Sequence, residues 1–180
     1  LRRQRQMCIR DRRFIDTGKA SVGAATGKAS LATAKAICAV LRDGDFVPHE
    51  TIDKADELMR AVAWPLLIQS AGLARIKSGK LALTTAGKKA LTKAPQNTLK
   101  HIWNRWVAKS KFDEFSRINE IKGQKSKGRN GLTPVFERRE AVVEALIECP
   151  VGEWVYIDDF FTYFQAADIQ FEVTNDPWKL

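Results

Sequence analysis

The sequence contains little that would support a disulfide framework, a metal site or a membrane span. It has three cysteines and two histidines, all widely separated, and no CxxC pair. Disulfide frameworks and structural zinc sites need several such residues at short, regular spacing. No apolar run approaches the roughly 18 residues of a membrane helix, and no apolar signal segment follows the basic amino terminus. We therefore expect a cytoplasmic protein with no metal, no cofactor and no membrane partner.

Catalytic motifs are also lacking. Residues 23–30, GAATGKAS, resemble a phosphate-binding loop, which requires GxxxxGK followed at once by Ser or Thr. Here the spacer is one residue short and Ala29 follows Lys28. Asp158 and Asp159 are adjacent, and at the start of a helix they are better explained by the helix dipole than by paired catalysis. We predict no catalytic residues in this chain. A nucleotide-dependent enzyme using the 23–30 loop remains an alternative.

Charge is segregated along the chain. The formal net charge of +9 includes about +5 from residues 1–13, about +13 from residues 75–139 and about −8 from residues 140–180. A basic middle beside an acidic tail indicates a surface that faces a polyanion, or two modules with different partners. A lysine-rich solvated surface without any ligand is the alternative.

The two ends of the chain look like the ends of a fragment. The first dozen residues, LRRQRQMCIRDR, resemble translated adapter sequence. We therefore treat residues 1–13 as artefact or disorder and exclude them from the fold. A native basic arm for nucleic acid is the alternative. Because the chain stops shortly after a helix-like segment, we expect it to be part of a larger protein.

Residues 14–94 predict a single domain of three helices, a hairpin and a further helix. Ser30 is a good N-cap, Pro65 suits a first helical turn, and Gly72 can take the positive φ that ends a helix. The expected elements are a helix over 31–41, an extended piece at 46–47, helices over about 51–59 and 65–71, a hairpin over 73–84, and a helix from Thr84 or Thr85. This order is that of a winged helix-turn-helix.

The segment LARIKSGKLALT, residues 73–84, is the most informative local pattern. Ser78-Gly79 can form a two-residue hairpin turn. The resulting register gives the hairpin one apolar face and one basic face. It pairs Ile76 with Leu81 and Ala74 with Leu83 on the apolar face, and sets Lys77 opposite Lys80, beside Arg75, on the basic face.

Three further segments follow the hairpin domain. Residues 95–121 are expected to form an amphipathic helical extension, and residues 122–131 a Gly-rich basic linker. Residues 132–180 predict a helix, an extended piece at 154–157 and a helix capped by Asp158, which is the start of a second, truncated winged-helix-like module. The predicted fold class is therefore mainly α with a small β-sheet (α+β). The apolar stripe of the extension consists of Leu99, Ile102, Trp103, Trp106 and Val107.

Two stretches of the chain resemble a known family. These are SVGAATGKASLATAKAICAVLRDGDF and LIQSAGLARIKSGKLALTTAGKKAL, within residues 20–92. They are similar to the winged-helix region of prokaryotic helicase-associated proteins related to XPB-like helicases. The resemblance implies a domain that contacts DNA or braces a motor domain. The chain has no Walker A motif, acidic helicase box or arginine finger, so the resemblance implies no ATPase activity for these residues.

The leading functional hypothesis is an accessory DNA-binding module of a larger helicase-like or regulatory protein. Residues 65–71 would be the candidate recognition helix, and the hairpin would be the wing. Because that helix has few polar groups, we expect phosphate contacts rather than base readout. The alternative is a protein-interaction scaffold, in which Trp103 and Trp106 dock a motor or partner domain. The candidate nucleic-acid-binding residues are Arg75, Lys77, Lys80, Lys88, Lys89, Gln69 and Ser70.

Overall fold

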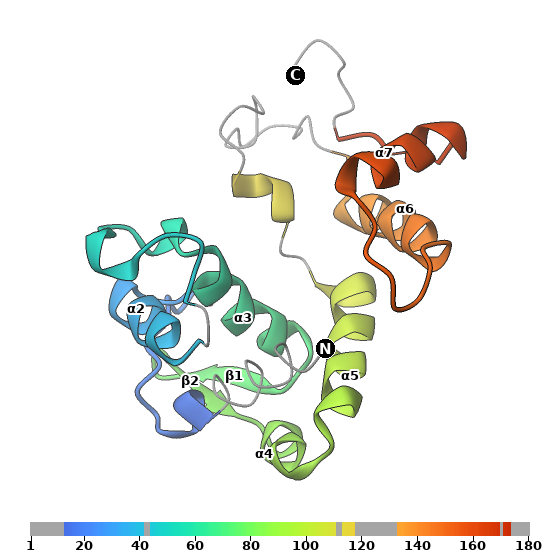
Figure 1. The fold of residues 1–180 in the computed structure, drawn as a ribbon. Helices are drawn as coiled ribbons and strands as arrows, with labels where there is room; N and C mark the ends of the chain where they lie inside the picture. The colour runs from blue at the N-terminus through green and yellow to red at the C-terminus, as the bar shows by residue number, and fades with distance from the viewer. Residues whose placement is uncertain (1–12, 42–43, 111–112, 118–132, 170, 174–180) are drawn as a thin grey trace. The chain divides into compact units, whose positions relative to one another are not determined.

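The computed structural model describes residues 13–41, 44–110, 113–117, 133–169 and 171–173 (Figure 1). The chain divides into two compact units, residues 1–110 and residues 111–180. The described residues are mainly helical, with one two-stranded antiparallel sheet, which confirms the α+β class. The expected linker at 122–131 and most of residues 1–13 lie outside the described residues. Within the described part, no helix is long and apolar enough to cross a membrane.

In its described part, the first unit has helical residues at 13–16, followed by further α-helices, two short 3-10 turns and the hairpin. Helix α3 packs against α2, α5 and β1 (Figure 1). In chain order the elements are α2 (Leu31–Val40), η1 (His49–Thr51), η2 (Ala55–Glu57), α3 (Met59–Ser70), β1 (Ala74–Lys77), β2 (Lys80–Leu83), α4 (Thr85–Thr92) and α5 (Pro95–Lys109).

Helix α2 begins where the sequence predicts. The Ser30 hydroxyl accepts a hydrogen bond from the Thr33 N–H at 3.3 Å, which satisfies one of the free donors of the first turn. The Thr33 hydroxyl in turn accepts from the Ser21 N–H at 2.8 Å and is buried. Ile37 and Cys38, on the apolar face, are buried in a core shared with α3. The cap therefore ties the preceding loop to α2 while the helix is held by its apolar face.

Two expectations about the middle of this unit were wrong. Residues 51–59 do not form one helix, because the backbone is extended at Ile52 and Lys54, and only the short turns η1 and η2 form on either side. Helix α3 starts at Met59, and Pro65 lies inside it. A continuous buried face that includes Leu58, Val62 and Ile68 outweighs the roughly 3 kcal/mol that an internal proline costs.

A carboxylate from a preceding loop caps α3. Asp45 Oδ2 accepts a hydrogen bond from the Ala61 N–H at 3.0 Å, and Asp45 Oδ1 accepts from the Phe46 N–H at 2.8 Å. A carboxylate at a helix N-terminus also interacts favourably with the helix dipole. Asp45 therefore supplies the cap that Leu58, at the N-cap position, cannot.

The hairpin has the predicted register, with Ile76 opposite Leu81 and Lys77 opposite Lys80. The two turn residues have φ of 49° at Ser78 and 71° at Gly79, which is the signature of a type I′ turn. A preceding segment runs alongside β2. The Leu81 N–H donates to the Ala20 carbonyl at 2.8 Å, and the Val22 N–H donates to the Gly79 carbonyl at 2.9 Å.

Helix α4 lies close to the base of the hairpin. The Thr84 hydroxyl caps it by accepting from the Gly87 N–H at 3.0 Å, and it donates to the Gly72 carbonyl at 2.8 Å. Gly72 has a φ of 71°, as predicted for the residue that ends α3. A Cβ at Gly87 would lie 1.9 Å from the Leu73 carbonyl oxygen, so only glycine allows this approach. The position of α4 on the hairpin is thus set by backbone contacts.

Helix α5 completes the first unit. Ile102 is buried in the same core as Ile68 and Leu81, and Leu99 packs against that core. The Ser110 hydroxyl, fully buried, bonds the Ser70 hydroxyl at 3.2 Å. Residues up to Ser110 therefore fold with the hairpin.

The second unit contains η3 (Glu114–Arg117), α6 (Val135–Ile147) and α7 (Ile157–Ala166). A small core of Ala141, Ala145 and Phe164 joins α6 to α7. The helix, extended piece and helix follow the predicted order, although residues 154–156 are not part of a strand. The predicted cap at Asp158 was wrong. Tyr156 occupies the N-cap position, so Asp158 lies in the first turn, where its charge still favours the helix dipole.

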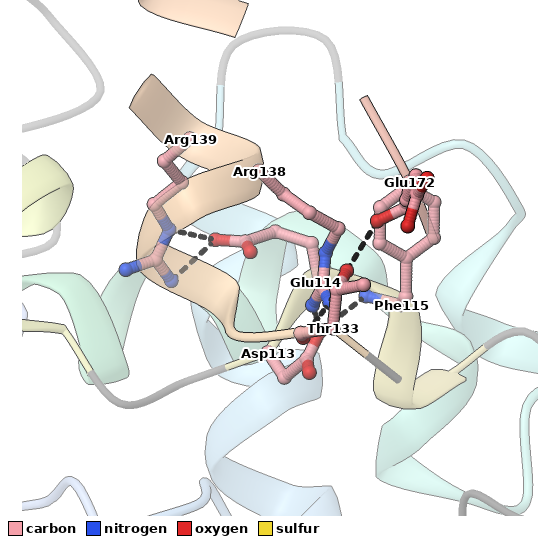
Figure 2. A network of polar contacts seen from close by, with 7 residues as sticks. All are labelled: Asp113, Glu114, Phe115, Thr133, Arg138, Arg139 and Glu172. Atoms are coloured by element: carbon pink, nitrogen blue, oxygen red, sulfur yellow. Dashed lines mark hydrogen bonds and ion pairs between the residues drawn. The ribbon is translucent and has the colours of Figure 1, made fainter. Parts of the chain in front are cut away.

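Two buried arginines hold α6 to the segment before it (Figure 2). Arg138 Nη2 lies 2.7 Å from Asp113 Oδ1, and Arg139 Nη2 lies 2.8 Å from Glu114 Oε1. Both arginine side chains are less than 5% exposed. Arg138 also donates to the Thr133 carbonyl. Because a buried guanidinium without acceptors is costly, these contacts fix the start of α6.

Candidate nucleic-acid interface

The outer face of the hairpin carries three exposed cationic side chains. Alternation along the two strands puts Arg75, Lys77 and Lys80 on the face opposite the buried Leu81 and Leu83. All three cationic residues are exposed. The structure therefore places these predicted residues together on one surface.

Lys77 and Lys80 are direct cross-strand partners next to the turn. Such partners have Cβ atoms about 5 Å apart, and two ammonium groups about 6 Å apart in water repel by about 0.7 kcal/mol. This cost is small enough for the hairpin to tolerate without a ligand. An anion placed between the two side chains would attract both ammonium groups, and these two attractions would outweigh the repulsion.

No nearby carboxylate in the sequence offsets these cations. The chain has no Asp or Glu between Glu57 and Asp113, a stretch that spans α3, the hairpin, α4 and α5. Within the described residues, no ion pair involves the three hairpin cations. The basic face is therefore neutralised neither by its own strands nor by the helices that follow it.

Helix α4 adds two of the predicted residues. Gly87 and Ala90 face the core, which leaves Lys88 and Lys89 exposed on the outer side of the helix. Because α4 starts two residues after β2 and packs against it, these lysines lie on the element adjoining the hairpin. Lys93, directly after α4, is also exposed.

Gln69 and Ser70 are engaged within the first unit. Gln69 Nε2 donates to the carbonyl oxygens of Gly27 and Pro65, both at 2.9 Å. The Ser70 hydroxyl donates to the Leu66 carbonyl at 2.9 Å and contacts Ser110. Their hydrogen-bonding groups therefore serve the fold in this structure.

The candidate recognition helix is enclosed. Every side chain from Arg60 to Ser70 is buried or half-buried, because α2, α5 and β1 cover most of α3. A helix that reads bases needs an exposed polar face that can enter the major groove. The exposed cations of the hairpin and α4 are consequently the strongest candidates for contact with nucleic acid.

Basic residues on α5 were not among the predicted site residues. Lys100 and Lys109 are exposed on this helix, within the same acid-free stretch. The absence of any carboxylate over residues 58–112 was the sequence signal that points to them. They extend the basic character of the first unit beyond the hairpin.

The 23–30 loop closes on itself. The Gly23 N–H donates to the Lys28 carbonyl at 2.9 Å, and the Gly27 N–H donates to the Gly23 carbonyl at 2.8 Å. Lys28 Nζ lies 3.7 Å from a carboxylate oxygen of Asp56. In a phosphate-binding loop the N–H groups and the lysine face the ligand instead. Across the described residues, no three His, Cys, Asp or Glu side chains are placed to hold a metal ion.

The basic surface of the first unit is the strongest indication of function in this chain. Its exposed members come from the hairpin and α4, while Gln69 and Ser70 point to internal partners. No protein-family model, curated protein or solved structure matches the chain significantly.

Proposed function

We propose that the chain is a DNA-binding winged-helix module, and an accessory part of a larger helicase-like or regulatory protein. The observation that carries the proposal is the exposed hairpin face with Arg75, Lys77 and Lys80, inside a stretch without carboxylates. Clustered cations on one face are the electrostatic footprint of a nucleic-acid-binding domain.

The order of elements supports the winged-helix interpretation. Helix α2, a connecting segment, helix α3 and the β1–β2 hairpin follow one another, and residues 20–22 run beside β2. In this arrangement the hairpin is the wing. Its apolar face rests on the core and its basic face is directed outward.

Contacts with phosphates rather than bases fit the exposed side chains. Lysines interact with phosphates as point charges, whereas base readout needs side chains with paired donors and acceptors in the groove. Gln69, which has such an amide, is bound to Gly27. We therefore expect weak sequence preference and strong salt dependence.

The test is binding of a fluorescein-labelled 20-bp duplex to the full chain, measured by anisotropy. The hairpin variant replaces Arg75, Lys77 and Lys80 together by alanine. Each lost phosphate contact at 0.1 M salt costs up to about eight-fold in affinity by counterion release, so we expect a loss of at least ten-fold and up to about 500-fold.

A matched control removes the same charge elsewhere in the first unit. Lys28, Lys35 and Lys54 lie outside the hairpin, α4 and the acid-free stretch of residues 58–112. Their joint replacement by alanine is expected to change affinity by no more than about three-fold, through long-range electrostatics. Equal losses in the two triple variants would show that the hairpin is not the contact surface.

A scaffold role is the second candidate, because α5 exposes an aromatic side chain. Trp103 is 44% exposed, and its ring centroid lies 5.1 Å from that of Trp106. Exposed tryptophans are common anchors in protein interfaces. If α5 docks a partner, Trp103→Ala will leave duplex affinity unchanged and abolish binding to that partner.

A further inference from the structure

The second unit exposes large apolar side chains along one continuous stretch of chain. Val151 and Trp154 are fully exposed, at 101% relative accessibility, and Tyr156 is 80% exposed. The stretch runs from the end of α6 through the connecting segment into α7. We call it the 146–161 surface, and its exposed apolar residues are Leu146, Ile147, Val151, Trp154, Val155, Tyr156, Ile157 and Phe161.

These side chains are not part of the core of the unit. Phe160 and Phe164 face inward from α7 and contact each other with ring centroids 5.1 Å apart. Ile157 and Phe161, one turn apart on the same helix, are 69% and 51% exposed. Helix α7 is thus apolar on its outer side as well as its inner side. Contiguous apolar exposure of this kind marks an interaction site, whereas single exposed residues do not.

A small pocket lies beside this surface. Its volume is about 170 Å³, and its apolar lining includes Cys149, Val155, Phe160 and Tyr163. Glu148 and Asp159 also line it. This is space for one large side chain of a partner, with two acidic residues in the lining. Anchor residues that fill such pockets usually dominate binding energy.

The charged residues within this stretch of the chain are all acidic. The sequence has no Lys or Arg from residue 140 to residue 173, while Glu148, Glu153, Asp158 and Asp159 are exposed. A partner with the same charge would be repelled, and a neutral one would gain nothing from these carboxylates. The complementary occupant carries apolar side chains flanked by Lys or Arg.

We infer that the 146–161 surface binds a basic amphipathic segment of a partner protein. The apolar side of the segment covers Trp154 and its neighbours, one side chain enters the pocket, and its cations face the surrounding carboxylates. This recognition resembles a helix that places its apolar face in a groove. It is independent of the nucleic-acid interface, which lies in the first unit and has the opposite charge.

The test uses the full chain and two labelled 18-residue amphipathic peptides. One has leucine on one helical face and lysine on the other, and the second has glutamine in place of every lysine. We expect the lysine peptide to bind with a micromolar Kd and the glutamine peptide to bind at least ten-fold more weakly. The basic first unit repels the lysine peptide, so its binding reports the second unit.

Two variants locate the site. Trp154→Ser with Tyr156→Ser removes apolar area that no described residue of the unit covers. We expect this variant to bind the lysine peptide at least ten-fold more weakly, with an unchanged far-UV circular dichroism spectrum. Glu148→Gln with Glu153→Gln should weaken binding of the lysine peptide and leave binding of the glutamine peptide unchanged. Phe46→Ser is the control, because Phe46 is a 70% exposed aromatic residue of the first unit, and it should leave binding unchanged.

Three results would overturn the inference. Equal affinity for the two peptides would show that the surface does not select basic segments. Unchanged binding in the Trp154/Tyr156 variant would place the site elsewhere. Sedimentation that reveals a dimer, abolished by the same variant, would make a second copy of the chain the occupant instead.

Discussion

Gly87→Ala tests whether backbone contact sets the position of α4. The added Cβ would lie 1.9 Å from the Leu73 carbonyl oxygen and 2.9 Å from its carbon. To reach ordinary contact at 3.4 Å, α4 and Leu73 must move apart by about 1.5 Å. Two hydrogen bonds cross this contact, from the Thr84 N–H to the Leu73 carbonyl at 3.0 Å and from the Thr84 hydroxyl to the Gly72 carbonyl at 2.8 Å.

The competing effects have opposite signs. Alanine is about 1 kcal/mol better than glycine inside a helix, which favours the variant. Loss of two hydrogen bonds at about 0.5–1.5 kcal/mol each, together with overpacking of about 1–3 kcal/mol, opposes it. We expect Gly87→Ala to lower the free energy of unfolding by about 1–5 kcal/mol, because the lost hydrogen bonds and the overpacking together exceed the gain in helix propensity.

Thermal unfolding followed by circular dichroism measures this effect. For a unit of about 100 residues, 1 kcal/mol corresponds to roughly 4–8 °C in Tm, so a decrease of at least about 4 °C is expected. Ala86→Gly is the control, since Ala86 is exposed on the same turn and reports helix propensity alone. An equal or higher Tm for Gly87→Ala would refute the close approach of α4 to Leu73.

Three other substitutions test local features of the fold by chemical denaturation. Asp113→Ala should cost about 2–4 kcal/mol by leaving the buried Arg138 without its carboxylate, and Asp113→Asn should cost less because an acceptor remains. Ser30→Ala should cost about 0.5–2 kcal/mol through loss of the α2 cap, while Ser30→Asp should retain most of it. Gly79→Ala should cost about 1 kcal/mol because its φ is 71°, whereas Ser78→Asn should be neutral or stabilising in a type I′ turn. A stabilising Gly79→Ala, or equal effects of the two substitutions at residue 113 or at residue 30, would contradict these assignments.

The hairpin could be predicted because its determinants are local. A two-residue turn and strict alternation of apolar and polar residues specify the register, and the structure has that register. The caps at Ser30 and Thr84 are equally local, since each hydroxyl accepts from an N–H three residues ahead. The basic face of the candidate interface follows directly from this register.

The start of α3 and the hydrogen-bond partners of Gln69 and Ser70 depend on contacts between residues that are far apart in the sequence. Asp45 caps α3 from 16 residues away, and the shared burial of the α3 face overrides the local signal of Pro65. Gln69 bonds a carbonyl 42 residues away, and Ser70 a hydroxyl 40 residues away. Tertiary packing specifies such partners. The local sequence pattern does not contain this information, and it therefore predicted that the two side chains lie on a recognition surface.

The most direct test of the cationic hairpin is the salt dependence of duplex binding. Plots of log affinity against log salt concentration for the intact chain should have a slope of about −3 to −5, as expected for three to five phosphate contacts. If Arg75, Lys77 and Lys80 each neutralise one phosphate, their joint replacement by alanine will flatten that slope by about 2.7. Equal slopes for the intact chain and the triple variant would mean that these side chains do not meet the DNA backbone.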